Sequence, residues 1–232
     1  MQRYYWYAVI PASRPLPPTL RGWHDMPLSG VREGDLVAVL CSVTSLDAQS
    51  ATPATRLHAS LLEGMMAATS FAILPMRFGT LIADPEDART ELRRHQSEWL
   101  DALRRVEGAA EFTVEVLWNP PAATPVPPAS KAGYLTRLAA DQARIRTLRG
   151  RARERSEPIL ERLAGLDRER RSTLLPRPNT LLEASYLVPE GAVQPFRARV
   201  EVAESLFPSY RWLLGGPWPP YHFAPGGSWD DG

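Results

Sequence analysis

The chain has 232 residues, of which 44% are hydrophobic and 23% charged, so it can bury one large core or two small ones. Its 27 basic and 26 acidic residues leave a net charge of +1, which gives no overall field that would attract nucleic acid or an anionic membrane. Cys41 is the only cysteine, which excludes an internal disulfide and a thiolate metal cluster and fits a reducing, cytoplasmic location. No stretch approaches the roughly 20 apolar residues of a membrane span.

The first part of the chain alternates strand and helix patterns. Residues 4–10 and 35–43 are rich in aromatic and β-branched side chains and predict buried strands, the second of which holds Cys41. Residues 54–69 carry apolar side chains at three- and four-residue intervals and predict a helix that covers a sheet. Residues 71–82 also have strand composition, but Pro75 lacks the amide proton of a ladder and indicates an edge or a bulge.

A second helix and a further strand complete this region. Asp84 and Pro85 are typical of a helix start, and Gly108 is a plausible end. Residues 111–118 alternate apolar and polar side chains, which predicts a strand with one buried face. The order strand, strand, helix, strand, helix, strand predicts an α+β fold in which residues 1–119 form a ferredoxin-like α/β sandwich.

Five prolines between residues 120 and 130 favour an extended linker, and we expect a domain boundary there. The arginine- and glutamate-rich segment that follows has an apolar residue at every seventh position, which predicts a long amphipathic helix or a helix pair broken near Pro158. The residues of this repeat are Leu138, Ile145, Ala152, Ile159 and Leu166.

Strand patterns at residues 180–188 and 209–214 enclose a helix pattern at residues 193–207. With the long helix they predict a smaller C-terminal α+β domain over residues 131–216. A tail rich in proline and aromatic residues, 217–232, follows it.

Four blocks of the sequence, in their order and spacing, are similar to the gas vesicle L/F protein family. The most specific one is Ile-Leu-Pro-Met-Arg-Phe-Gly-Thr at residues 73–80, preceded by a helix that carries His58. The others are the aromatic opening that ends in Val9-Ile10-Pro11, Tyr134-Leu135 at the start of the long helix, and Ala-Ser-Tyr-Leu-Val at 184–188 with Gly-Gly-Pro-Trp-Pro-Pro-Tyr-His-Phe at 215–223.

The resemblance implies a two-domain α+β accessory protein that meets the hydrophobic major shell protein while the gas-filled shell is started or grown. Other gas vesicle accessory proteins are further possible partners, and the protein would be cytoplasmic and associated with the gas vesicle. It implies binding without catalysis, with neither cofactor nor metal, and with no nucleic acid or membrane as partner.

Arg77 and Phe78 are the first candidate binding residues. Arg77 is a charge within an apolar run, so it either pairs and packs inside the protein or reaches solvent at an edge. In the second case Arg77 and Phe78 are predicted to dock the backbone or the acidic groups of another chain.

Trp218, Tyr221 and Phe223 form the second candidate set. Three prolines stiffen this segment, so it presents large rings at low entropic cost. The rings either pack back on the chain's own domains or anchor a partner.

Two alternatives to shell-protein binding stay open. The arginine-rich run 144–155 could serve as a nucleic-acid or regulatory binding module, although acidic residues close by partly offset its charge. An enzyme would have to use Cys41 or a histidine. However, the four histidines lack the spacing of metal ligands, and phosphate-binding glycine loops and hydrolase motifs are absent.

Overall fold

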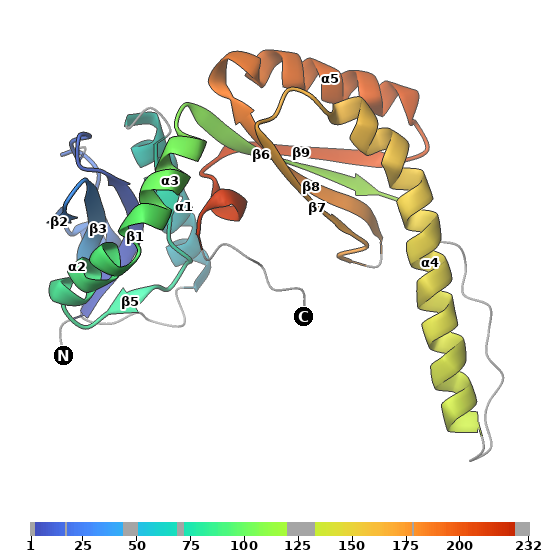
Figure 1. Ribbon diagram of the computed structural model, residues 1–232, viewed down its shortest axis with the longest axis horizontal. Coiled ribbons are helices and arrows are strands. Elements are labelled where there is room, and N and C mark those ends of the chain that lie inside the picture. The colour runs from blue at the N-terminus through green and yellow to red at the C-terminus, as the bar shows by residue number, and fades with distance from the viewer. Residues whose placement is uncertain are drawn as a thin grey trace. The chain divides into compact units, whose positions relative to one another are not determined.

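The computed structural model describes residues 3–16, 18–43, 51–68, 72–119, 133–177 and 179–225, without the side chains of 51–53 and 133–141. It contains two antiparallel sheets with helices, which confirms the predicted α+β class (Figure 1). The chain forms two compact units, Met1–Glu111 with Gly216–Gly232 and Phe112–Gly215. The predicted linker, 120–130, lies outside the described residues.

The first unit is built around an aromatic central strand. The sheet has the strand order β2-β3-β1-β4, and β5 also pairs with β1. β2 was not predicted, because its short segment lacks a clear alternation of apolar and polar residues. The strands are β1 (Arg3–Pro11), β2 (Leu28–Glu33), β3 (Leu36–Val43), β4 (Leu74–Pro75) and β5 (Leu81–Ile82).

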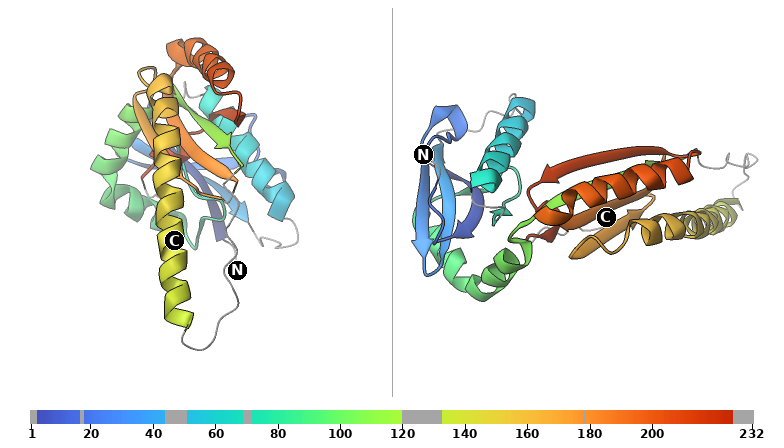
Figure 2. Two further views of the ribbon diagram at one scale, coloured as in Figure 1. Left: turned by 90° about the vertical axis from the view of Figure 1, so that its right-hand side faces the viewer. Right: turned by 90° about the horizontal axis from the view of Figure 1, so that it is seen from above.

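Helices cover both faces of this central strand. Tyr7 of β1 stacks on His58 of α1 (Ala51–Ala68), with ring centroids 5.6 Å apart. The neighbouring Trp6 meets Trp99 of α3 (Gln96–Val106) edge to face at 5.8 Å. Because successive side chains of a strand point to opposite faces, α1 covers one face and α3 the other, as Figures 1 and 2 show.

The helix predicted after Asp84 is present but divided. It consists of α2 (Pro85–Arg94) and α3, which meet at His95. Asp84 caps α2 as expected: its carboxylate accepts a hydrogen bond from the Glu86 backbone at 2.7 Å. The Asp87 carboxylate in turn accepts one from the Asp84 backbone at 3.1 Å, which completes a capping box.

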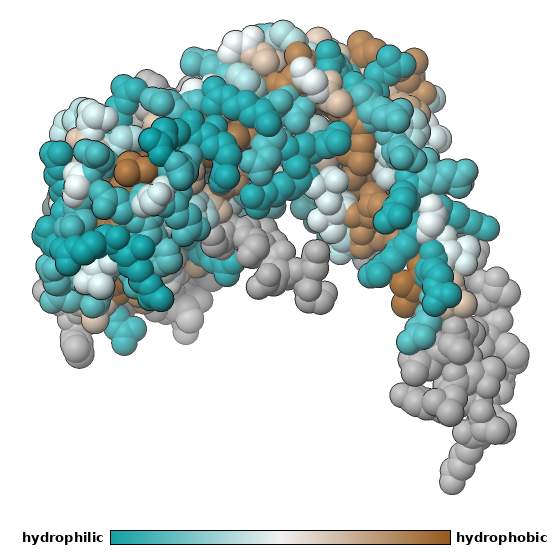
Figure 3. Space-filling view, viewed as in Figure 1, coloured by the Kyte–Doolittle hydropathy of each residue, from teal (hydrophilic) through white to brown (hydrophobic). Residues whose placement is uncertain are grey.

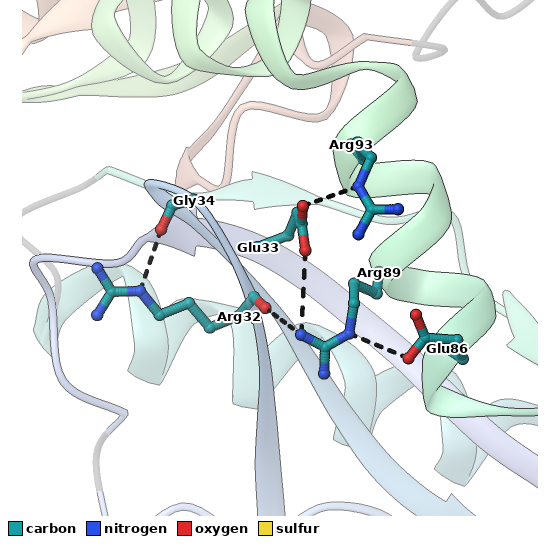
Figure 4. A network of polar contacts seen from close by, with 6 residues as sticks. All are labelled: Arg32, Glu33, Gly34, Glu86, Arg89 and Arg93. Carbon is teal, nitrogen blue, oxygen red and sulfur yellow. Dashed lines mark hydrogen bonds and ion pairs between the residues drawn. The ribbon is translucent and has the colours of Figure 1, made fainter.

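Ion pairs fasten α2 to the edge strand β2 (Figure 4). Glu33 of β2 accepts a hydrogen bond from Arg93 at 2.9 Å and lies 3.9 Å from Arg89. Arg89 also donates to the Arg32 carbonyl at 2.9 Å and pairs with Glu86 at 3.0 Å. Hydrogen bonding to Arg93 lowers the pKa of the Glu33 carboxyl, so this connection weakens in acid.

The continuous strand predicted over residues 71–82 is wrong, since only β4 and β5 pair there. Pro75 lies in the edge strand, as its missing amide proton predicts. Between the two short strands the Thr80 amide donates to the Arg77 carbonyl at 3.2 Å, and Gly79 has φ +86°. Only glycine adopts that conformation without strain, so the chain turns here. We call residues 76–80 the Arg–Phe turn.

The second unit has the order β-α-β-β-α-β and the strand order β7-β8-β6-β9, which is the ferredoxin-like arrangement. The ferredoxin-like fold expected for residues 1–119 is not confirmed, because the strand predicted at 111–118 is β6 and pairs in this second sheet. The elements are β6 (Ala109–Leu117), α4 (Gly133–Leu163), β7 (Glu169–Leu174), β8 (Thr180–Pro189), η3 (Glu190–Ala192), α5 (Val193–Leu206) and β9 (Arg211–Trp218).

An aromatic cluster forms the core of this unit. Phe196 of α5 lies 5.6 Å from the Phe112 ring of β6 and 5.0 Å from the Tyr186 ring of β8. All three side chains are fully buried. α4 is one helix with Pro158 inside it, and Leu166, the last residue of the predicted repeat, lies beyond its end. None of the helices in the described ranges is long and apolar enough to cross a bilayer.

Candidate functional site

A buried tyrosine and a buried histidine hold the Arg–Phe turn in place. The Gly79 amide donates a hydrogen bond to the Tyr5 hydroxyl at 2.8 Å, and that hydroxyl lies 3.1 Å from His58 Nδ1. The Tyr5 oxygen thus accepts from Gly79 and is also hydrogen-bonded to His58 Nδ1, with donor and acceptor set by the imidazole tautomer. Tyr5 therefore connects β1, α1 and the Arg–Phe turn.

His58 is a structural residue of this cluster. It is 4% exposed, and burial lowers its pKa to about 4, an effect that the nearby Met76 backbone only partly offsets. The imidazole is thus neutral at physiological pH. Burial also raises the pKa of Tyr5 and that of Tyr7, so both phenols keep their protons and act as hydrogen-bonding groups.

Phe78 lies over this cluster and is open to solvent on its other side. Its ring centroid is 5.7 Å from that of His58 and 6.3 Å from that of Tyr5, yet 44% of Phe78 is exposed. Arg77 beside it is also exposed. Its carbonyl accepts hydrogen bonds from the amide and, at 2.7 Å, the hydroxyl of Thr80. A charged and an aromatic side chain are thus presented together on a fixed turn.

The C-terminal tail is anchored on the same unit by its last described residues. Phe223 of η4 (Tyr221–Phe223) is fully buried, and its carbonyl accepts a hydrogen bond from Arg105 of α3 at 2.7 Å. The His222 amide donates to Glu111 at 2.9 Å, and His222 Nδ1 contacts the other Glu111 oxygen. For Phe223 the structure therefore agrees with packing on the chain's own core.

Tyr221 and Trp218 differ from Phe223. Burial raises the pKa of the half-buried Tyr221 phenol, and the negative forms of Glu63 and Tyr5 raise it further. Trp218 is 40% exposed and makes no ring contact with the cluster in the described part of the chain. The accessible candidates are therefore Arg77, Phe78 and Trp218.

Sequence reasoning missed the residues that support this surface. Tyr5 and His58 are separated by 53 positions, and only the fold brings them together. Glu111 was assigned to the polar face of a strand, but it is 2% exposed because it binds the tail. A carboxylate at the start of a strand gives no signal of a partner more than a hundred residues later.

The enzymatic alternative would need grouped metal ligands or a reactive Cys41. Within the described ranges, no three His, Cys, Asp or Glu side chains are grouped so that they could hold a metal ion. Cys41 lies buried in β3, as predicted, and burial raises the pKa of its thiol, which disfavours the nucleophilic thiolate.

Fold and site together define a two-unit α+β protein that presents Arg77 and Phe78 on a fixed turn. Two crystal structures of the gas vesicle protein GvpF share this fold. The protein from Anabaena sp. PCC7120 superposes with a TM-score of 0.75 at 17% identity, covering 97% of this chain and 96% of that one. The protein from Microcystis aeruginosa gives 0.78 at 18% identity, covering 95% and 98%.

Sequence comparison identifies the family. Residues 3–225 match the family model of the gas vesicle synthesis protein GvpL/GvpF. Gas vesicle protein L of Streptomyces sp. (strain CB03234) is 29% identical over 248 residues, covering 95% of this chain and 92% of the relative. The chain belongs to the GvpL/GvpF family, which confirms the resemblance inferred from its sequence blocks.

Proposed function

We propose that this chain is an accessory protein of gas vesicle assembly that binds the hydrophobic major shell protein while the shell is initiated or grown. It acts at the gas vesicle by binding, without catalysis, and other accessory proteins of the vesicle are further partners. Family membership supports the connection to gas vesicles. The observation that carries the binding role is the 44% exposure of Phe78 on a turn that a hydrogen bond to Tyr5 holds in place.

A fixed aromatic side chain suits the capture of an apolar subunit. Fully burying a phenylalanine contributes about 1.5–3 kcal/mol, and aromatic and arginine side chains are enriched among the residues that dominate interface energies. The hydrogen bond from Gly79 to Tyr5 holds the turn before the partner arrives, so little conformational entropy is lost on binding. Arg77 supplies charged donors for carbonyl or carboxylate groups at the rim of such a contact.

Trp218 is the second proposed anchor, because its exposed ring is held in β9 directly before Pro219 and Pro220. Tyr221 and Phe223 also remain in the proposed binding segment. Their burial suggests that they support the position of Trp218, with Phe223 fixed in the core.

The test is a titration of the purified chain with the purified major shell protein, read out by pull-down and by light scattering of the shell protein. Phe78→Ala should weaken binding about tenfold or more and leave the melting temperature unchanged. Arg77→Ala and Trp218→Ala should weaken it less. Met26→Ala is the matched control, since Met26 is a similarly exposed apolar residue of the same unit, at 39%. Equal binding by the wild type and Phe78→Ala would contradict the assignment of the site.

A further inference from the structure

The helix α4 carries an apolar stripe that the described chain covers toward the C-terminal end of the helix and leaves exposed at Ile145. Ile145, Leu148, Ala152, Ser156, Ile159 and Leu163 recur at three- and four-residue intervals and so share one side of the helix. Ala152, Ile159 and Leu163 are fully buried, whereas Ile145 is 51% exposed and Leu148 is partly exposed. The stripe that packs against the unit's own core thus continues into solvent. We call residues 142–153 the α4 arm.

The figures agree with this description. In Figure 1 the N-terminal half of α4 extends past the end of the four-stranded sheet. Figure 3 shows apolar atoms along one side of the described part of this helix and hydrophilic atoms along the other. The stripe therefore continues along a part of α4 that lies beyond the sheet of its own unit.

Arginines border the stripe on both sides. Helical spacing places Arg144 and Arg151 along one border and Arg149 and Arg153 along the other. All four are exposed, and none of them forms an ion pair with the described part of the chain. The arm holds a fifth arginine, Arg146, and no glutamate or aspartate between residues 142 and 153.

This combination of charge and apolar surface restricts the occupant. A second copy of the arm would bring arginine borders against arginine borders, and like charges at such flanking positions are destabilising. Nucleic acid would neutralise the arginines but leave Ile145 without an apolar contact. An amphipathic helix with acidic borders satisfies both features, because its apolar seam covers the stripe and its carboxylates meet the arginines.

We propose that the α4 arm is a docking site for an acidic amphipathic helix of a different protein, which packs on Ile145 and Leu148 between the two arginine borders. Twelve residues of helix span about 18 Å, so the arm matches roughly two heptads of its partner. This site is separate from the Arg–Phe turn, and its occupation does not depend on binding of the shell protein.

The test uses the full chain and a fluorescent designed peptide of three heptads, with Leu and Ile in the seam and Glu at both borders. Anisotropy titrations compare it with the same peptide carrying Lys at the borders, a 20-base-pair DNA duplex and phosphatidylglycerol vesicles. The Glu peptide should bind the wild type at least tenfold more tightly than the Lys peptide does. Sedimentation of the chain alone should show no self-association mediated by the arm.

Three variants identify the surface. Ile145→Asp combined with Leu148→Asp should weaken binding of the Glu peptide tenfold or more. Thr147→Asp adds a charge on the opposite side of the same helix. Apart from the general loss that one added negative charge causes, it should change the affinity for the Glu peptide less than twofold. Arg144→Glu combined with Arg149→Glu should reverse the preference toward the Lys peptide. Circular dichroism of each variant shows whether the helix is retained.

Several results would overturn the proposal. DNA or vesicles that bind more tightly than the Glu peptide, with no effect of Ile145→Asp, would mark the arm as a surface for polyanions or lipid. Self-association that the Ile145→Asp variant abolishes would make a second copy the occupant. Failure of the Glu peptide to bind at all would exclude the acidic helix.

Discussion

His58 and Phe78 have ring centroids only 5.7 Å apart, but they carry different parts of the proposed function. His58 is buried and neutral and helps to hold the turn, while Phe78 keeps an exposed face for a partner. The resemblance to the gas vesicle L/F family indicated both residues, because Phe78 lies in the shared block 73–80 and His58 in the helix that precedes it. It could not indicate which of them is accessible, since exposure depends on Tyr5 and on a turn that strand composition conceals.

The burial of His58 predicts a specific dependence of stability on pH. Its pKa is about 4 in the folded protein and about 6.5 in the unfolded chain, so the unfolded chain binds more protons between these values. Stability from the neutral imidazole is therefore complete above pH 6.5 and is lost as pH falls toward 4, by about 1.4 kcal/mol per pH unit.

Urea unfolding of the wild type and His58→Gln at pH 7.5, 6, 5 and 4.5 checks this dependence. The variant should be less stable at neutral pH. Its free energy of unfolding should also change less with pH, because the contribution of His58 is missing. Carboxylates contribute equally to both proteins and cancel in the difference. Parallel pH profiles would show that His58 does not titrate as its burial requires.

Phe223 and Trp218 give a second prediction at the scale of single residues. Phe223→Ala should destabilise the protein by about 3–5 kcal/mol, because a fully buried ring leaves a cavity. Trp218→Ala should cost less than about 1 kcal/mol, because much of its ring is exposed. Thermal unfolding measures both, and equal losses would mean that Trp218 is a core residue.

Element starts were easier to predict than strand pairings. Asp84 and Pro85 identified the beginning of α2 from the chemistry of helix termini alone. β7 was missed because its exposed, charged side chains give no apolar alternation. The division of residues 71–82 into β4 and β5 was missed although Pro75 indicated an edge or a bulge, since aromatic and aliphatic composition favoured a single strand.

The cap of α2 provides a prediction at this scale. Asp84→Ala removes the acceptor for the Glu86 amide and should destabilise the first unit by about 1 kcal/mol. Asp84→Asn keeps an acceptor and should recover most of that loss. Denaturant unfolding measures both variants. A cost equal to that of Asp84→Ala in the Asn variant would show that charge at the helix terminus, and not the hydrogen bond, is responsible.

The attachment of η4 to β6 gives a further prediction. Glu111→Ala should cost about 1–3 kcal/mol, because the part-buried His222 amide loses its acceptor. It should also increase hydrogen exchange at residues 221–223. Glu107→Ala is the matched control: its side chain is 56% exposed in an ion pair with Arg14, so its loss should cost at most about 1 kcal/mol. Unchanged exchange at residues 221–223 in Glu111→Ala would contradict an anchoring role.

For the whole molecule, the α+β class and most helices and strands followed from periodicity, but their distribution between the units did not. The pattern of residues 111–118 predicts that one face of a strand is buried, but it does not predict which strands pair with that strand. β6 pairs with β8 and β9, whose residues come much later in the chain. The ferredoxin-like order therefore appears in the second unit, where the prediction did not place it.

The first unit includes residues 216–225 as well as the first 111, and this has a consequence during translation. A ribosome releases the chain from its N-terminus, so more than a hundred residues of the second unit emerge before Phe223 can enter the core of the first. Until then Glu111 and Arg105 lack their contacts with the tail. Both units of a nascent chain therefore stay unfinished until almost all of these residues have been synthesised.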